Sequence, residues 1–320
     1  MKDIYHVVVT RFSIRIHPEG ALRGKSREWL FDKDRLLQKL VLFEHVSLAS
    51  LAKGSEQPDL LLVLIDKELP DTIRQNLEGI IEPYSWAQTL ELDAGALSKM
   101  TDLGSLLGDF AIDANYILNT NLDDDDALGA DYIRNLKTMV KRHRIERPNQ
   151  PFQWFGTTDI QEWDILLSQA FPLGFTKYWT GSVHHALSPG YSVLSKNHPS
   201  GPNIFLLPHN HCFDILNRKQ HRKNYNQMGR FKFRVKLAIT ALKMGSGKTV
   251  LDIIRKTQFA TRIDKKWPGQ FKALMVNHGD NLQSTRIDRG ASLREPCKPE
   301  IIHLNFNVNA LKIISFFNPE

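Results

Sequence analysis

Short apolar runs alternate with amphipathic stretches along the first 150 residues. Two of these runs predict buried strands, Tyr5–Thr10 and Leu60–Ile65, because they are almost wholly apolar and rich in β-branched or leucine side chains. Two further predicted strands and three stretches with helical spacing follow the same alternation: strands Gln88–Leu92 and Ala114–Leu122, and helices Lys33–Val46, Asp71–Ile80 and Leu128–His143. This order is typical of a largely parallel α/β sheet with helices on both faces.

The pattern weakens after residue 150, where Gly, Pro, His and Asn become frequent. We expect residues 151–320 to complete the domain begun by residues 1–150 and to add a basic, loop-rich C-terminal extension. The predicted elements of this part are three strands and two helices: Phe152–Gly156, Tyr191–Leu194, Asn203–Leu207, then Phe231–Leu242 and Thr249–Phe259.

Composition narrows the class of protein. At 320 residues, with 42% hydrophobic and 24% charged residues, the chain has globular averages, which excludes disorder, collagen and coiled coil. The longest aliphatic run is too short to span a bilayer, and no secretion signal is seen at the N-terminus. Two cysteines are too few for disulfides to stabilise a chain of this size, so we expect a cytoplasmic protein. Contact with the inner face of the membrane is a further expectation.

Charge is distributed unevenly. Residues 1–160 hold 19 Lys and Arg against 25 Asp and Glu, whereas residues 161–320 hold 23 against 10. The segment Arg218–Lys236 carries eight basic residues and no acidic one. Such a field attracts phosphates of nucleic acid, nucleotide or anionic lipid, although a solvated surface explains it equally well.

Four consecutive aspartates, Asp123–Asp126, follow the predicted strand Ala114–Leu122. The carboxyl end of a strand is where ligands bind in open α/β sheets. Adjacent carboxylates repel one another by about 1 kcal/mol per pair even in water, so a divalent cation would stabilise them. In an extended backbone, Asp123 and Asp125 would point the same way, ~6.6 Å apart. Oxygen ligands favour Mg²⁺ or Mn²⁺, whose open positions suit a diphosphate; the alternative is an acidic turn in which Asp126 caps the next helix.

The strand, the aspartates and the helix together resemble the Asp-x-Asp region of GT-A glycosyltransferases. The stretch Asn119–Leu128 (NTNLDDDDAL) is especially similar to the rhamnosyltransferase-type family among them. Further segments resemble the same family: Val8–Phe12 (VVTRF), Leu42–Glu44, Ser47–Leu51, Leu61–Asp66, and Met275–Asn281 with Arg286 and Gly290. The resemblance covers residues 5–140 and, by one short motif, residues 270–290.

This resemblance implies a GT-A-like, Rossmann-type fold and a nucleoside-diphosphate-sugar donor. Residues 1–150 would form the donor-binding half and residues 151–320 the acceptor side. Thr10 and Arg11 would contact the base or ribose, and Asp66 would hydrogen-bond the base. Asp124 and Arg286 would also face the donor.

The same resemblance implies a metal site made by Asp123, Asp125 and Asp126, with His278 completing the metal or diphosphate shell. Two departures from the family pattern concern the donor. Asn121 stands where a basic residue is expected, and Asp124 occupies a position that is often asparagine.

We therefore predict a Mn²⁺- or Mg²⁺-dependent transferase that moves a sugar, with rhamnose as one candidate, to a glycan or lipid-linked acceptor. A carboxylate or a histidine would accept the acceptor proton if the anomeric centre inverts, and the candidate carboxylates are Asp159, Glu162 and Asp214. The turn Ser188–Tyr191 could pack near the donor sugar or be an ordinary turn. The alternatives are an inactive nucleotide-sugar-binding protein and a nucleic-acid-binding protein that uses Arg218–Lys236, although nucleic acid is not the expected partner.

Overall fold

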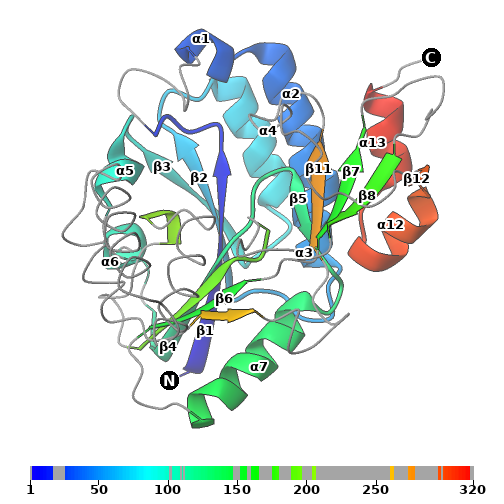
Figure 1. Ribbon diagram of the computed structural model, residues 1–320. Coiled ribbons are helices and arrows are strands. Elements are labelled where there is room, and N and C mark those ends of the chain that lie inside the picture. Colours follow the sequence, from blue (N-terminus) through cyan, green and yellow to red (C-terminus); the bar gives the residue numbers. More distant parts are fainter. Residues whose placement is uncertain are drawn as a thin grey trace, which may run out of the picture.

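A computed structural model describes most of the first half of the chain and selected parts of the second. The described residues are 2–16, 26–100, 103–108, 110, 112–146, 152–156, 160–165, 175–179, 189–196, 204–206, 260–262, 273–277, 295–296 and 298–317. They form a mixed α/β arrangement of two sheets with helices packed against them (Figure 1).

The larger sheet has seven strands in the order β10-β6-β9-β4-β1-β2-β3. Four of its six neighbouring pairs are parallel, and β9 is antiparallel to both β4 and β6. The predicted mostly parallel sheet is therefore confirmed, and strands from the second part of the chain join it. Its strands are β1 (Lys2–Phe12), β2 (Leu60–Asp66), β3 (Ala87–Leu92), β4 (Ala114–Asn121), β6 (Phe152–Gly156), β9 (Ser192–Lys196) and β10 (Ala260–Arg262).

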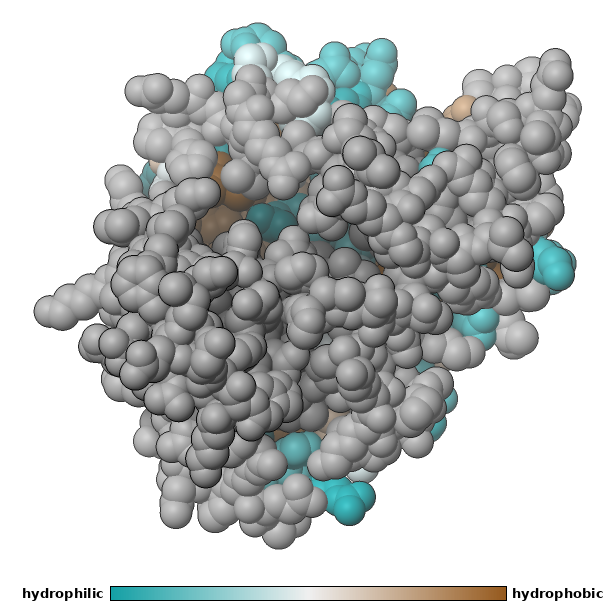
Figure 2. All heavy atoms as spheres, viewed as in Figure 1, coloured by the Kyte–Doolittle hydropathy of each residue, from teal (hydrophilic) through white to brown (hydrophobic). Residues whose placement is uncertain are grey.

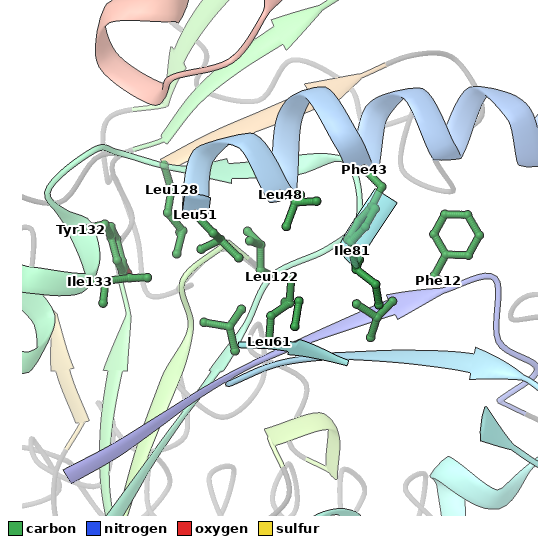
Figure 3. Close-up of a cluster of buried hydrophobic side chains, with 14 of the residues drawn as sticks. Phe12, Phe43, Leu48, Leu51, Leu61, Ile81, Leu122, Leu128, Tyr132 and Ile133 are labelled. Atoms are coloured by element: carbon green, nitrogen blue, oxygen red, sulfur yellow. The ribbon is translucent and has the colours of Figure 1, made fainter. Parts of the chain in front are cut away.

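One face of this sheet carries the main hydrophobic core. Alternate residues of β1 and β2 point into it because successive strand side chains face opposite ways. The core is covered by α2 (Lys33–Leu42), η2 (Phe43–Leu48), α3 (Ala49–Ala52), α4 (Asp71–Ile81) and α7 (Tyr132–Glu146). Figure 3 shows Phe43, Leu48 and Leu51 of the continuous helix α2–η2–α3 directed at Leu61 of β2. Each such leucine, when buried, contributes about 1.5–3 kcal/mol.

The opposite face packs against a thinner layer. Val7, Val9 and Leu62 point to this side and meet Leu97 and Leu107. Leu97 belongs to the short helix α5 (Ala96–Lys99), and Leu107 to the short helix α6 (Leu103–Leu107). Both faces of the central strands are thus covered, which explains why β2 has no exposed residue and reads as a continuous apolar run.

A second sheet lies beside the first, with five strands in the order β12-β8-β7-β11-β5. Helices α12 (Pro299–Phe306) and α13 (Ala310–Phe317) cover one of its faces (Figure 1) and share a core with Leu42 of α2 and Val46 of η2. The strands are β5 (Asp126–Leu128), β7 (Ile160–Asp164), β8 (Phe175–Trp179), β11 (Ala273–Asn277) and β12 (Glu295–Pro296).

Three local predictions were wrong. Residues 204–206 form a 3₁₀ turn, η3 (Ile204–Leu206), in place of the predicted strand Asn203–Leu207. Residues 126–128 form a strand, and the helix predicted to start at Leu128 begins at Tyr132. The helix predicted to end at Val46 continues through η2 and α3 to Ala52, and six of its residues, Phe43–Leu48, are π-helical. The short α1 (Arg27–Leu30) was not predicted.

The predicted helices Phe231–Leu242 and Thr249–Phe259 lie outside the described residues, as does the basic segment Arg218–Lys236. Within the part that the structure describes, no helix is both long and apolar enough to cross a membrane.

Candidate active site at the carboxyl ends of β1 and β4

The strand order of the larger sheet places the candidate active site at the carboxyl ends of β1 and β4. The chain runs from β1 to β2 and β3 on one side, and then β4 pairs with the other side of β1. Crossovers therefore leave in opposite directions at β1 and β4, and the crevice outside such a switch point is where ligands bind in α/β sheets. Arg11 is the penultimate residue of β1, and Asp123 follows β4 two residues after its last residue.

The four aspartates form a tight turn, which we call the Asp turn (Asp123–Asp126). The backbone N–H of Asp126 donates to the carbonyl of Asp123 at 3.1 Å, so the stretch is not extended as predicted. Asp123 and Asp125 are half-buried, whereas Asp124 and Asp126 are buried. Because Asp126 starts strand β5 and the next helix begins at Tyr132, Asp126 does not cap a helix. The Asp turn thus directs two carboxylates outward and two inward.

Two basic side chains from neighbouring elements bind this turn. Nη2 of Arg11, in β1, lies 2.9 Å from Oδ1 of Asp123. Nζ of Lys39, in α2, lies 2.5 and 2.7 Å from the two carboxylate oxygens of Asp124. Both members of the Lys39–Asp124 pair are largely buried, with side-chain exposures of 12% and 5%. Arg11 was predicted at this site, whereas Lys39 was missed because nothing in its sequence context separates it from an ordinary helix lysine.

Electrostatic crowding persists despite these cations. Burial raises the pKa of Asp126 well above its ordinary value, the charges of Asp125 and Asp123 raise it further, and a hydrogen bond from the Val276 backbone lowers it. Burial also raises the pKa of Asp124, against the lowering effect of Lys39. The raised pKa values show that burial and the neighbouring carboxylates make the charged forms of Asp124 and Asp126 less favourable, and a cation bound nearby would oppose that effect.

The candidate ligands of the Asp turn suit a hard divalent ion, since all of them are carboxylate oxygens. Asp123 and Asp125 are the members of the Asp turn exposed enough to reach such an ion. Among the described residues, however, no three or more His, Cys, Asp or Glu side chains are grouped closely enough to hold a metal. His278, predicted to complete the shell, lies outside the described residues, so the metal site stays a prediction.

The π-helical segment η2 fixes the backbone of the Asp turn. Ser47 Oγ donates to the carbonyl of Asp123 at 3.1 Å, and Ser50 Oγ donates to the carbonyl of Ser47 at 2.8 Å. Ser50 Oγ also accepts from the N–H of Leu128 at 3.3 Å. Widened π turns occur often at functional sites because they redirect side chains from a helix. Both serines belong to a segment that resembles the family, but no role was predicted for either of them.

The turn before β9 is bound to the end of β4. The N–H of Asn121 donates to the carbonyl of Tyr191 at 2.8 Å, and the N–H of Gly190 donates to the carbonyl of Asn121 at 3.0 Å. The hydroxyl of Tyr132 donates to the carbonyl of Gly190 at 3.0 Å. This turn, predicted as either a sugar-side turn or an ordinary one, therefore lies next to the residues that lead into the Asp turn.

Gly190→Ala is expected to lower the free energy of unfolding by about 2–4 kcal/mol, from a strained backbone and an overpacked site. Gly190 has φ +76, and an added Cβ would lie 2.2 Å from the Tyr132 hydroxyl oxygen. Denaturant titration measures the loss. The matched control is Gly79→Ala in α4, where a Cβ meets nothing within 4 Å and stability should stay equal or rise by up to about 1 kcal/mol. Equal effects at the two positions would contradict this account.

The other predicted donor residues are placed as follows. Thr10 is fully buried, and its hydroxyl has no hydrogen-bond partner in the described part of the chain. Asp66 is also fully buried and is bound by Arg15. Arg286 lies outside the described residues. The nucleotide contacts implied for Thr10 and Asp66 therefore stay predictions.

Glu162 is the one predicted base that the structure describes, since Asp159 and Asp214 lie outside the described residues. In the second sheet, Met275 is paired with Glu162 on one side and with Asp126 on the other. Residues in one cross-strand row point to the same face, so Glu162 shares a face with Asp126, about 10 Å away at two strand spacings. That face is opposite to the one covered by α12 and α13.

The space-filling view shows the described side chains of one face of the molecule (Figure 2). Hydrophilic ones gather around α1, at the top of the view, and side chains of both kinds are visible deeper in the molecule.

Comparison with known families adds to this geometry. Residues 5–152 match the model of a family described as "Putative rhamnosyl transferase". This segment therefore resembles a family of sugar-transferring enzymes. The matched segment runs from β1 to the start of β6 and contains Arg11, Lys39 and the whole Asp turn. No curated protein matches the sequence.

Solved structures show only distant likeness. TarS 1–349 of S. aureus in complex with UDP-GlcNAc is 10% identical, with 99% of this chain and 71% of that chain covered and a TM-score of 0.38. Mouse xyloside xylosyltransferase 1, apo form, is 8% identical, with 82% and 86% covered and a TM-score of 0.33. Another structure of TarS 1–349 is 12% identical with a TM-score of 0.31, and the match covers 60% of this chain and 47% of that chain. Likeness at this level does not bear on the activity of the chain.

Proposed function

We propose that the protein transfers a sugar from a nucleoside diphosphate to a hydroxyl of a glycan or lipid-linked acceptor, in a reaction that depends on Mn²⁺ or Mg²⁺. The observation that carries this proposal is the Asp turn at the switch point between β1 and β4. Support comes from the family match over the same residues. Rhamnose is one candidate for the transferred sugar, on the family's description alone.

The roles of the residues follow from their placement. Asp123 and Asp125 would hold the cation, which when bound supplies positive charge against the developing charge of the diphosphate. Arg11 orients Asp123 and adds a positive charge on the donor side. Ser47 and Lys39 keep the Asp turn in place from the helix side.

In the transfer step, the bond between the anomeric carbon and the diphosphate oxygen breaks as the acceptor oxygen bonds to that carbon. The acceptor proton must go to a base if the centre inverts. Glu162 is proposed for this role because it is the candidate base that the structure describes and it shares a face of the second sheet with Asp126, about 10 Å away at two strand spacings.

Asp125→Ala tests the proposal. We expect binding of the preferred nucleotide sugar in the presence of Mn²⁺ to weaken at least about tenfold, because one of the two outward carboxylates is lost. Isothermal titration with a panel of nucleoside diphosphates and their sugars measures this. Asp131→Ala is the control, since Asp131 is exposed in the connection that follows and pairs with Arg134. Undiminished binding in Asp125→Ala, or wild-type binding that chelator leaves unchanged, would refute the metal-dependent function.

An inactive nucleotide-sugar-binding protein would pass the binding test. Single-turnover assays with donor and a mixture of acceptors separate the two functions, because only a transferase consumes the donor in an acceptor-dependent manner.

A further inference from the structure

The carboxylate of Asp66 accepts four hydrogen bonds from groups of the same chain. Oδ2 accepts from Nε of Arg15 at 2.8 Å and from the Arg15 backbone N–H at 3.1 Å. Oδ1 accepts from Nη2 of Arg15 at 2.8 Å and from the Glu68 backbone N–H at 3.0 Å. A carboxylate offers about four acceptor positions, and all four are occupied here. Asp66 is also 0% exposed, so a nucleobase has neither access nor an open acceptor.

The Arg15 side chain is likewise buried and bound by acidic partners, Asp66 and Glu68. Its side chain is only 8% exposed, and it also contacts Glu68 Oε1 at 2.9 Å. Its guanidinium lies 5.7 Å from the centre of the Phe31 ring. Removal of Arg15 from Asp66 would leave two buried charges without their two-point contact, which is strongly unfavourable. A base-reading Asp66 would require that removal in every binding event.

The Arg15–Asp66 clamp holds a turn with a strained backbone. Ser13, which directly follows β1, has φ 49, a left-handed value that is costly outside glycine. Its hydroxyl accepts from Nη1 of Arg35 at 3.2 Å, and the carbonyl of Arg15 accepts from the N–H of Gly95 at 3.0 Å. The turn Ser13–Ile16 is thus bound to β2, to α2 and to the connection before α5. Arg11, which binds the Asp turn, lies two residues before Ser13.

We propose that Asp66 is a positioning residue that acts through Arg15: the clamp holds the turn after β1, so that Arg11 stays directed at the donor site, and Asp66 does not itself read the nucleobase. This inference rests on the proposed function for its ligand, a nucleoside diphosphate. It assigns base selection to groups other than the Asp66 carboxylate.

The test is a double-mutant cycle with Asp66→Asn, Arg15→Gln and the double variant. Affinities for UDP, GDP and ADP with Mn²⁺ are measured by isothermal titration. Each single variant should weaken all three nucleotides by about tenfold, with the ratios between nucleotides unchanged, and the double variant should bind no more weakly than the weaker single variant. A changed nucleotide ratio in Asp66→Asn, or losses that multiply in the double variant, would overturn the proposal.

A second pair controls for loss of an acidic charge at the same sheet edge. Lys67 and Asp93 form an exposed ion pair of 2.9 Å, so Asp93→Asn should leave affinity and melting temperature unchanged. Arg15→Lys is a milder variant for use where Asp66→Asn does not fold. It keeps the charge but loses the two-point contact, so it should weaken binding without altering the nucleotide ratio, and an altered ratio would count against the clamp.

Melting temperatures of the same variants, measured without any ligand, test whether Asp66 and Arg15 stabilise the fold as one pair. A double variant that melts well above the value expected from summed single losses supports the clamp, and additive losses refute it. If the wild-type protein binds no nucleoside diphosphate, the proposed function fails, while the melting temperatures still decide whether Asp66 acts through Arg15.

Discussion

Lys39→Met is expected to lower the free energy of unfolding by about 3–5 kcal/mol, because Asp124 would be left as a buried carboxylate without its cation. The pair is close, at 2.5 Å, and its members are 12% and 5% exposed. Denaturant unfolding measures the loss. The double variant Lys39→Met, Asp124→Asn should recover most of it, because an uncharged amide no longer needs a buried counter-charge.

Lys33→Met is the matched control for this variant. Lys33 is the first residue of the same helix and is exposed, so its replacement should change stability by less than about 0.5 kcal/mol. Equal losses in the two variants would show that the Lys39–Asp124 contact contributes nothing of its own. Mn²⁺ should also raise the melting temperature of Lys39→Met more than that of the wild type, since the positive charge that Lys39 places beside Asp124 is then lost.

Glu162→Gln is expected to reduce turnover by about 10²–10⁴-fold, the usual contribution of a general base, while donor affinity stays near that of the wild type. The amide keeps the size of the side chain but cannot accept the acceptor proton. Turnover is measured with saturating donor, and donor affinity separately by titration.

Glu300→Gln makes the same chemical change on the exposed surface of α12 and should leave turnover unaltered. Should Glu162→Gln behave like this control, the base must be sought elsewhere, and Asp159 and Asp214 become the residues to replace next. A reaction that retains the anomeric configuration would also spare Glu162→Gln, so the product configuration should be determined alongside.

The parallel core of the fold was predictable because it is encoded locally. Strands such as Leu60–Ile65 are buried on both faces and therefore read as unbroken apolar runs, and helix α4 shows its buried face at regular spacing. The location of the Asp turn was predictable for a related reason: it follows a strand of a parallel sheet, and the carboxyl ends of such strands share one edge.

The environment of the Asp turn was not predictable, because it depends on residues far apart in sequence. Lys39 meets Asp124 across 85 positions, and Ser47 meets Asp123 across 76. The strand at Asp126 was missed since its three residues pair with β11, about half the chain later. The π-helix was missed because one widened turn barely alters the apolar spacing that predicts a helix.

The second sheet has a consequence for how the protein is made. Strand β5, which starts at Asp126, has β11 as its partner, and the Leu42 and Val46 side chains are covered by α12 and α13. Synthesis proceeds at about 5–20 residues per second, so β11, α12 and α13 leave the ribosome on the order of ten seconds or more after the Asp turn. Nascent chains that already contain the whole family segment would still lack an assembled site, and a ribosome stall before residue 273 would leave acidic and apolar surfaces open to chaperones.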